Sequence, residues 1–404
     1  MAEIIIVGGG AAGLMAAGAA SRMGHTVTVL EHSEIPGKKI LVTGKGRCNL
    51  TNHCDEQTFL QNVRTNPRFL YSALYSWPPA KTMALFQELG VPLKTERGRR
   101  VFPVSDQAED IRQALLTYAS GADIRSAHVT KLLLEEGRCI GVEDDTGRRW
   151  KGDAVLIATG GVSYPGTGSR GDGYKLASQA GHKIVPPVAS LCSLVSPDPD
   201  CPKMMGLALK NVTLTLYQDN KAVFSQQGEM LFTHFGISGP LTLSASCYIK
   251  NMKQHTWTAE IDLKPALDPD TLYKRITQDF ALLANKSAQG ALVKLLPASM
   301  QPVMVRRWGI DPQTKANQIT REEKRRLVEL VKHFRVPITR RGDLDHAVIT
   351  SGGVDVSQVN PKTMESKLCP GLYFAGEVLD LDAYTGGYNL QIAFSTAQAA
   401  ARAF

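Results

Sequence analysis

The sequence lacks the features of an exported, metal-binding or membrane-spanning protein. Its seven cysteines are odd in number and no two have C-x-x-C spacing, which argues against a disulfide framework, a zinc site or a dithiol redox pair. No later stretch is apolar and long enough to cross a bilayer. The uncharged run Ile4–Ala20 follows Glu3 instead of basic residues and is interrupted by glycines, which argues against a signal peptide. We therefore expect a cytoplasmic protein without a resident metal.

Charge of one sign is not gathered in any long run either. The chain has 404 residues and a net charge of +8, and its basic clusters at 97–100, 306–307, 321–326 and 340–341 are short and scattered. No RNA- or DNA-binding motif accompanies them. This pattern favours a solvated surface over a nucleic-acid interface, although a basic surface also attracts an anionic substrate. The length allows two or three domains.

The start of the chain carries a glycine motif between an expected strand and an expected helix. Ile4–Val7 is a β-branched apolar run typical of a buried strand, and a helix of small residues is expected over 11–23. Between them, Gly8, Gly10 and Gly13 have the spacing G-x-G-x-x-G. These glycines permit, in turn, a tight turn, the approach of a pyrophosphate to the backbone, and close packing of the helix on the strand. The helix N-terminus would then hold the phosphates.

An acidic residue follows at the position that a dinucleotide site requires. Glu31 comes directly after the second expected strand, Thr26–Leu30, 18 residues beyond Gly13. Its carboxylate can accept hydrogen bonds from both hydroxyls of an adenosine ribose but would repel a 2′-phosphate, which favours FAD or NAD over NADP. The alternative is a glycine-rich turn in an ordinary α/β protein, and the strand, helix and acid around the motif argue against it.

The middle of the chain predicts a meander and then a second kind of sheet. Residues 65–120 are expected to be mostly helical, with a hairpin over 91–104. The expected meander has strands at 123–134, 139–144 and 149–151, and a buried strand follows at 154–157. Apolar and polar residues alternate at 211–217, 222–226, 230–233 and 256–263, which predicts an antiparallel sheet or small barrel. Residues 268–333 are expected to be helical, with a capping box at Thr320–Glu323.

A second G-x-G-x-x-G, formed by Gly166, Gly168 and Gly171, does not predict a second dinucleotide site. Pro165 and other residues separate it from the strand, the helix is expected only from about Asp172, and no ribose-reading acid follows. Near the other end of the chain, a glycine-rich turn opens a helix expected over 390–403. Its N-terminus would stabilise negative charge on the pyrimidine edge of a flavin.

Together these segments resemble a bacterial flavoprotein family that includes aminoacetone oxidases and bile-acid reductases. The resemblance is carried by VGGGAAGL near the start, GKKILVTGKGRCNLTN at 37–52, ATGG at 158–161, FTHFGISGP at 232–240, TSGGV at 350–354 and PGLYFAGEVLDLDAYTGGYNLQ at 370–391. It implies an α/β fold in which a Rossmann-like two-dinucleotide-binding FAD domain, with a parallel sheet and a β-meander, holds an inserted antiparallel β-domain with a helical insertion. The implied boundaries are 1–188 and 350–404 for the FAD domain, 189–265 and 336–349 for the β-domain, and 266–335 for the helices.

The resemblance also implies non-covalent FAD and a set of contacts to it. Carried over by motif, these are Gly8, Gly10, Ala12, Gly13, Glu31, Lys38, Gly46, Arg47, Cys48, Asn49, Thr159, Gly160, Gly376, Glu377, Asn389, Leu390 and Gln391, with Val129 as a backbone contact to adenine. No catalytic side chain is assigned. By chemistry alone, Lys45, His234 and Tyr388 are candidates, and His234 is also a candidate structural residue of its loop.

The function expected from these features is that of an FAD-dependent oxidoreductase acting on a small-molecule substrate. Hydride would pass between a substrate carbon and flavin N5. Two subtypes stay open: an oxidase acting on an amino ketone or amine, and a reductase that uses NAD(P)H and acts on an unsaturated, steroid-like compound. The lack of a second Rossmann motif leans toward the oxidase. The alternative class is a flavin-containing protein that binds or modifies tRNA. The sequence leaves the substrate and the oligomeric state open.

Overall fold

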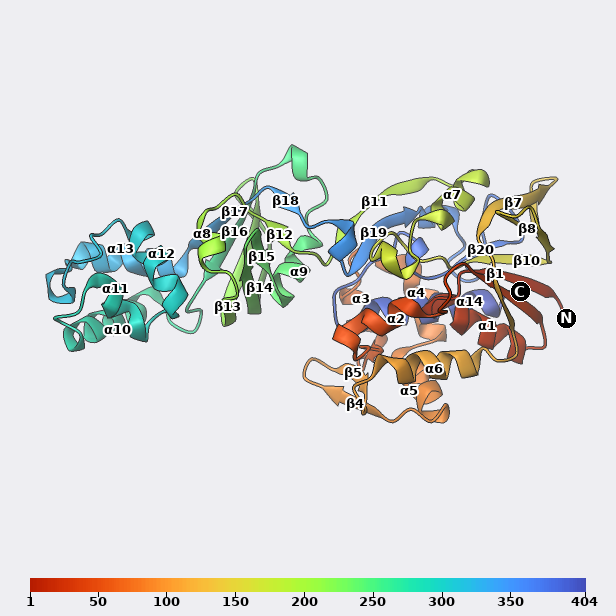
Figure 1. Ribbon diagram of the computed structural model, residues 1–404, viewed down its shortest axis with the longest axis horizontal. Helices are drawn as coiled ribbons and strands as arrows, with labels where there is room; N and C mark the ends of the chain where they lie inside the picture. The colour runs from red at the N-terminus through yellow and green to blue at the C-terminus, as the bar shows by residue number, and fades with distance from the viewer. The chain divides into compact units, whose positions relative to one another are not determined.

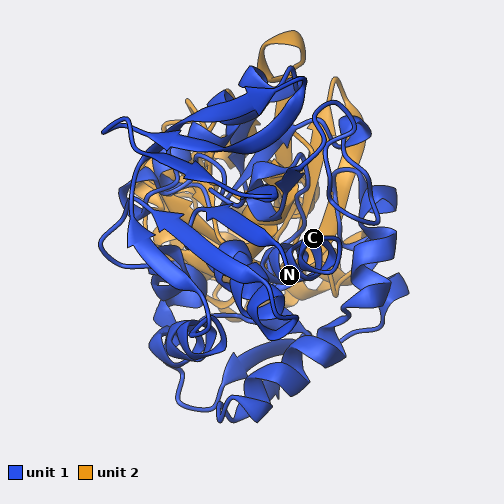
Figure 2. Cartoon of the chain, turned by 90° about the vertical axis from the view of Figure 1, so that its right-hand side faces the viewer, with its two compact units in different colours: residues 1–190, 343–404 blue, residues 191–342 orange.

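A computed structural model describes all residues of the chain, 1–404 (Figure 1). The chain forms two compact units, one of Met1–Ser190 with Asp343–Phe404 (unit 1) and one of Leu191–Gly342 (unit 2), coloured separately in Figure 2. The sheet and the helices of unit 2 share one hydrophobic core, so they are described together here. A separate helical domain at 266–335 stays a prediction.

Unit 1 is built on a five-stranded parallel sheet. Its strand order is β20-β10-β1-β2-β6, and every neighbouring pair is parallel. The strands are β1 (Glu3–Val7), β2 (Thr26–Glu31), β6 (Asp123–Ser126), β10 (Ala154–Ile157) and β20 (Leu372–Phe374). β1 and β10 are buried along almost their whole length, which explains their β-branched and apolar composition. The chain continues from β1 toward β2 on one side and from β10 toward β20 on the other, so a topological switch point lies between β1 and β10.

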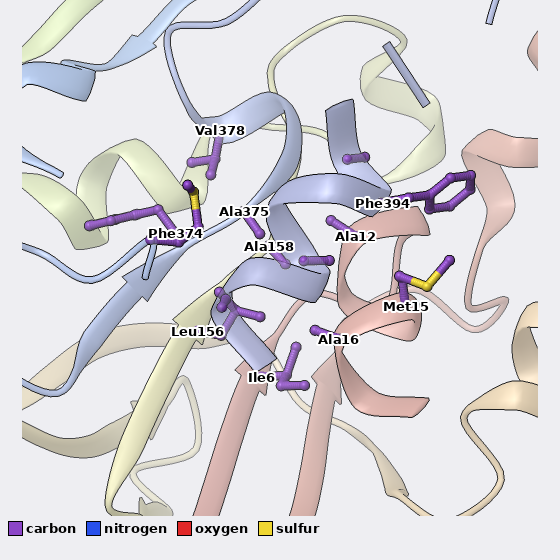
Figure 3. Close-up of a cluster of buried hydrophobic side chains, with 14 of the residues drawn as sticks. Ile6, Ala12, Met15, Ala16, Leu156, Ala158, Phe374, Ala375, Val378 and Phe394 are labelled. Atoms are coloured by element: carbon purple, nitrogen blue, oxygen red, sulfur yellow. The ribbon is translucent and has the colours of Figure 1, made fainter. Parts of the chain in front are cut away.

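Two helices of small residues, one from each end of the chain, pack against this sheet. They are α1 (Ala11–Arg22) and α14 (Tyr388–Ala401), and nearly all of their residues are buried. A Cβ at Gly18 of α1 would lie 2.2 Å from the Tyr118 ring of α6 (Ala108–Tyr118), so this helix also packs tightly on its outer side. Figure 3 shows side chains from β1, β10, β20, α1 and α14 meeting in one buried cluster. The α/β class and the parallel sheet predicted from the sequence are confirmed.

One strand predicted for the meander is wrong in its extent. The expected strand at 123–134 is two strands: β6 joins the edge of the parallel sheet beside β2, and β7 (Val129–Glu135) begins the meander with β8 (Arg138–Asp144) and β9 (Arg149–Lys151). The backbone N–H of Ala127 bonds to the carbonyl oxygen of Glu31 where β6 ends. No glycine or proline marks this break, so the apolar pattern alone did not indicate it.

The rest of unit 1 consists of short helices and strands outside the parallel sheet. The helices are α2 (Lys38–Val42), α3 (Glu56–Gln61), α4 (Pro67–Ser76), α5 (Pro79–Glu88) and α7 (Asp172–Gln179), and the strands are β3 (Thr51–Asn52), β4 (Leu93–Glu96), β5 (Arg100–Pro103), β11 (Ile184–Ser190) and β19 (Ile349–Val354). The hairpin expected over 91–104 is β4 and β5. The glycine- and lysine-rich block at 37–52 begins with α2 and a 3-10 turn at Thr43–Gly46.

Unit 2 contains a seven-stranded antiparallel sheet and four α-helices in its C-terminal half. The strand order is β17-β16-β13-β14-β15-β12-β18. The strands are β12 (Leu194–Val195), β13 (Ala208–Gln218), β14 (Lys221–Thr233), β15 (Gly236–Ser238), β16 (Trp257–Asp262), β17 (Phe334–Ile338) and β18 (Arg340–Arg341); the helices are α8 (Asp200–Lys203), α9 (Pro240–Ser246), α10 (Pro269–Leu282), α11 (Ala288–Ala291), α12 (Gln301–Trp308) and α13 (Arg321–Lys332).

Two predictions for unit 2 need correction and one is confirmed in detail. The two strands expected at 222–226 and 230–233 are one long strand, β14, which stays paired with β13 through Gly228, where the extra residue of a bulge lies on β13. The loop around His234, at 233–240, contains β15, because the chain turns back after β14 and β15 pairs with β14. The capping box of Thr320 and Glu323 at the start of α13 is present. No helix of either unit is long and apolar enough for a membrane span.

Candidate functional site

The three motif glycines form a tight turn with open space at its centre. A Cβ at Gly8, whose φ is 103°, would lie 2.7 Å from the carbonyl oxygen of Ala158, so β1 and β10 end in backbone contact. A Cβ at Gly13 would lie 1.9 Å from the Gly8 oxygen. At Gly10, by contrast, an added Cβ would meet nothing within 4 Å. The side of Gly10 on which a side chain would project is therefore open at the N-terminus of α1, next to the switch point.

Glu31 lies at the carboxyl end of β2, beside this turn. Its Oε2 accepts a hydrogen bond from the Gly9 N–H at 2.6 Å, and its Oε1 accepts one from the Ser33 N–H at 2.7 Å. These two bonds fix the carboxylate, and each oxygen keeps a lone pair for a further donor. Val129, the predicted adenine contact, is buried in β7 at the start of the meander.

The second half of the predicted site comes from the other end of the chain and contacts the first. A Cβ at Gly376 would lie 2.9 Å from the Cβ of Ala12 in α1 and 3.7 Å from that of Ala393 in α14. Farther along the same helices, Gln398 Nε2 lies 3.3 Å from Met15 Sδ. Figure 3 shows Ala12, Ala375 and Phe394 in this region. The starts of α1 and α14 are therefore held close together, as the glycine patterns at both ends predicted.

The block at 37–52 is tied to the start of α14 by three side chains. The Asn49 carboxamide, in the orientation that satisfies its neighbours, accepts a hydrogen bond from the Gly387 N–H at 3.0 Å. Thr51 donates to Gln391 Oε1 at 2.7 Å, and Asn52 donates to the Gly386 oxygen at 3.1 Å. The two most specific sequence blocks of the chain thus form one continuous piece of structure.

The side chains of the three predicted contacts in α14 bond to or pack against other protein groups. Gln391 is fully buried, and its Nε2 donates to the Trp77 oxygen at 3.0 Å. The Asn389 carboxamide bonds to both the N–H and the oxygen of Ala383, and Leu390 is partly buried against the core. The first N–H groups of a helix have no partner within it. Asn389 and Leu390 are therefore placed to contact a ligand through the backbone.

Glu377, another predicted contact, is the centre of a network that the sequence did not indicate. Its Oε2 lies 2.7 Å from Lys39 Nζ, and its Oε1 accepts hydrogen bonds from the Ser163 hydroxyl and the Thr350 N–H, both at 2.8 Å. Burial raises its pKa more than any other single influence. The Lys39 charge and the three hydrogen bonds together outweigh burial, so the pKa of Glu377 is lowered below its ordinary value and the carboxyl is ionised.

Lys39, Ser163 and Thr350 are functional candidates that sequence reasoning missed. Lys39 is the second of two adjacent lysines, and only the turn of α2 shows which one faces Glu377. The neighbouring Lys38 donates instead to the Gly166 oxygen at 3.0 Å. Near this network, Gly160 has a φ of 75°, and the buried Oγ1 of Thr159 has no hydrogen-bond partner. This hydroxyl packs against the start of α7, since a Cβ at Gly173 would lie 2.1 Å from it.

The remaining predicted contacts lie in the turn after α2. The Arg47 guanidinium is bound by Glu96 and Asp106 and lies over the Phe102 ring, 4.2 Å from its centre, so this side chain anchors the β4–β5 hairpin. Cys48 is fully buried, and burial raises the pKa of its thiol to about 12. The side of Gly46 where a Cβ would project is open, with no atom nearer than 3.9 Å.

The three candidates for a catalytic side chain are not brought together within one unit. Lys45 is exposed in unit 1 with a left-handed φ of 61°. Tyr388 is buried edge-on to Phe59, with ring centres 5.0 Å apart, and burial raises its pKa to about 12. His234 is exposed at the turn between β14 and β15 in unit 2. The structure thus gives Tyr388 a packing role and leaves Lys45 and His234 solvent-facing.

Comparison with known proteins identifies relatives that span the whole chain. The family profile described as "HI0933-like protein Rossmann domain" matches residues 2–403. The chain is 33% identical to a ribosomal RNA dihydrouridine synthase of Haemophilus influenzae, over 99% of this chain and 97% of that protein. It is 31% identical to a 3-dehydro-bile acid delta(4,6)-reductase of Clostridium scindens, over 100% and 99%. A 3-ketosteroid-delta4-(5alpha)-dehydrogenase from Rhodococcus jostii RHA1 has a similar fold, with a TM-score of 0.51 at 16% identity, covering 100% of this chain and 96% of that one.

Proposed function

The chain belongs to the HI0933-like family of FAD-dependent oxidoreductases, and we propose that it reduces a carbon–carbon double bond conjugated to a carbonyl group, with uridine in ribosomal RNA as its substrate. The observation that carries this proposal is a chemistry shared by two relatives with different names. Dihydrouridine is uridine with its C5–C6 double bond saturated, and that bond is conjugated to the C4 carbonyl. A delta(4,6) 3-dehydro steroid carries its double bonds in conjugation with the 3-keto group. Both reactions add a hydride to an electrophilic carbon of a conjugated carbonyl system and a proton to another carbon of it: the hydride goes to C6 of uridine, β to the C4 carbonyl, and to the carbon β or δ to the 3-keto group of the steroid.

The described residues of unit 1 suit a flavin in this role. Reduced FAD supplies the hydride when it is bound, and we propose NAD(P)H as the source of the electron pair. The open space at Gly10 and the N-terminus of α1 fit a diphosphate, and Glu31 fits the hydroxyls of an adenosine ribose. The start of α14 has N–H groups without a partner in the helix, which would stabilise negative charge on the pyrimidine edge of the flavin. The ionised Glu377 adds a charged group near the end of β10.

The direction of the reaction and the choice of RNA rest on separate observations. The names of both relatives describe a reduction, so we prefer the reductase. The lack of a second Rossmann motif had favoured the oxidase. The two identities, 33% and 31%, do not separate the two substrate classes. The net charge of +8 favours a polyanion over a mainly apolar steroid, although the sequence alone favoured a solvated surface. Reduction of an unsaturated 3-keto steroid is the second candidate activity.

A single-turnover experiment separates these candidates without presupposing an electron donor. The purified holoprotein is reduced with dithionite under argon and mixed with deproteinised ribosomal RNA or with an unsaturated 3-keto steroid. We expect flavin reoxidation with the RNA and a gain of two hydrogens on a uridine nucleoside after digestion. Reoxidation by the steroid alone would favour the second candidate. Reoxidation by neither substrate, with rapid reoxidation by air, would favour an oxidase and contradict the proposal.

A further inference from the structure

The positive charge of this protein belongs entirely to one of its two units. Leu191–Gly342, unit 2, contains 21 lysines and arginines against 13 aspartates and glutamates. Unit 1 contains 25 of each, so its net charge is zero although it is the larger unit. The candidate flavin site lies in the neutral unit. The charge that would attract a polyanion therefore lies outside the residues assigned to flavin binding.

Within unit 2, most of the excess charge lies on the helices between 266 and 335. Acidic side chains there are largely used within the fold: Asp268 and Glu323 cap α10 and α13, and Asp279 lies 3.6 Å from Arg275. Eight cations of this segment make no ion pair: Lys274, Lys286, Lys294, Lys315, Arg321, Lys324, Arg325 and Arg326. All of them except Lys324 are exposed. These charges are available to a partner.

Three of these cations lie on α10 or on segments that contact it. Arg275 of α10 donates a hydrogen bond at 3.3 Å to the backbone oxygen of Lys294. The Arg325 guanidinium of α13 lies 5.9 Å from the centre of the Tyr273 ring of α10. In Figure 1, α10 and α13 are drawn within the same helical group of unit 2. Tyr273 and Arg275 point to nearly opposite sides of the helix, so the two contacts flank Lys274. Lys274, Lys294 and Arg325 are together called the helical cation cluster here.

We propose that the helical cation cluster binds the phosphate backbone of RNA, so that unit 2 docks the nucleic acid whose uridine is reduced at unit 1. This inference rests on the proposed function. Unpaired, flexible cations on helices are suited to phosphate contacts that position an RNA without reading its sequence. An anionic membrane is a poorer match, because the only large apolar side chains exposed between 266 and 335 are Leu282 and Val293, which lie on different elements.

The test compares two triple variants of the full-length holoprotein that carry the same net charge. One is Lys274→Gln/Lys294→Gln/Arg325→Gln, in the helical cation cluster. The control is Lys81→Gln/Lys151→Gln/Lys362→Gln, which removes three exposed lysines of unit 1 that make no ion pair. Flavin absorbance and thermal unfolding establish that both variants fold. Binding of a fluorescein-labelled fragment of ribosomal RNA is then measured over a series of salt concentrations, and binding of phosphatidylserine vesicles is measured beside it.

The slope of log K against log salt is negative, and we expect its magnitude to decrease by about two to three in the cluster variant, at roughly 0.7 to 0.9 for each lost phosphate contact, and to be unchanged in the control. An equal decrease of the slope in both variants, or no decrease in the cluster variant, would overturn the inference. The proposal that RNA is the substrate would still stand. Binding of vesicles but not RNA, lost in the cluster variant, would replace it with a membrane. A wild-type protein that fails to bind RNA at low salt would also overturn the proposal that RNA is the substrate. The flavin reoxidation experiment would then show whether the protein reduces the carbon–carbon double bond of the steroid.

Discussion

The side-chain amide of Asn52 donates a hydrogen bond at 3.1 Å to the backbone oxygen of Gly386, 334 residues later in the chain. It is one of three side-chain contacts that join 49–52 to the start of α14. A Cβ at Gly387 would lie 2.3 Å from Thr51, so the two segments pack backbone to backbone. The candidate flavin site is therefore assembled from distant parts of the sequence, and its integrity depends on contacts that no single motif contains.

The two glycines of the first motif should respond differently to alanine. At Gly10 the added methyl group meets no protein atom, and φ is −81°, so Gly10→Ala should leave the unfolding temperature of the flavin-free protein nearly unchanged. It should weaken FAD binding by at least about tenfold, or roughly 1.4 kcal/mol, because the methyl group occupies the space assigned to the diphosphate. Gly13→Ala should instead destabilise the fold by about 1–3 kcal/mol, since its methyl group would lie 1.9 Å from the Gly8 oxygen. Flavin titration and thermal unfolding of the flavin-free proteins separate these effects, and equal loss of stability in both variants would contradict the prediction.

The ion pair of Lys39 and Glu377 should make stability depend on pH. Because the folded pKa of Glu377 is lowered below 4.5, its stabilising contribution is present above that pH and disappears as the pH falls through the folded pKa. Lys39→Gln should destabilise the protein by about 1–3 kcal/mol at pH 7, since both side chains are less than one quarter exposed.

Urea unfolding at pH 7 and at a pH below 4.5 measures the difference in unfolding free energy between wild type and Lys39→Gln. The difference between wild type and Lys39→Gln should shrink at the lower pH, where Glu377 becomes neutral in the variant and then in the wild type. The control is Lys39→Gln/Glu377→Gln, which carries no unpaired carboxylate and should be more stable at pH 7 than Lys39→Gln alone. A gap that is the same at both pH values would show that Lys39 acts by packing.

The buried pair of Thr51 and Gln391 should be coupled in stability. Gln391→Leu removes the acceptor of the Thr51 hydroxyl and a donor to the Trp77 oxygen, and should destabilise the protein by about 1–3 kcal/mol. Thr51→Val removes the other partner of the same bond. In Thr51→Val/Gln391→Leu the loss should be smaller than the sum of the single losses, because the unsatisfied hydroxyl is gone. Additive losses in denaturant unfolding would mean that the bond contributes nothing specific.

All seven cysteines should be unreactive in the native protein. Each thiol is buried, and burial raises the pKa of Cys139 and Cys201 to about 11, so that the reactive thiolate is scarce at neutral pH. A chromogenic disulfide reagent should therefore titrate almost no thiol in the folded protein and seven in denaturant. One rapidly titrating thiol in the native state would identify a reactive cysteine that the structure does not indicate.

Features of the site that depend on local sequence were predictable, and features that depend on tertiary contacts were not. The turn at Gly8, Gly10 and Gly13 follows from steric requirements that act over a few residues, so the spacing indicated it together with the strand and helix on either side. The network around Glu377 joins Lys39, Ser163 and Thr350 from three distant segments, and no periodicity records that they meet. The same holds for Arg47, which the motif assigned to the cofactor and whose guanidinium the structure places against the β4–β5 hairpin.

The fold shows the same division. The buried strands β1 and β10 are apolar throughout, and the parallel sheet followed from them. The sequence did not indicate the boundary between β6 and β7. β6 ends where its pairing with β2 ends, and no change in composition marks that point. The basic residues at 321–326 were interpreted as solvated because acids lie among them. The capping role of Glu323 was predicted from the sequence, and the structure adds that Arg325 and Arg326 are exposed and make no salt bridge.

The use of both chain ends in one sheet has a consequence for synthesis on the ribosome. β20 and α14 are made long after α1, yet β20 completes the edge beside β10 and α14 packs against α1. Until β20 and α14 have emerged, a nascent chain exposes the unpaired edge of β10 and the small-residue face of α1. Exposed apolar surface and unpaired strand edges of this kind make an incomplete fold prone to aggregation. Assembly of the candidate flavin site therefore has to wait until both late segments have been synthesised.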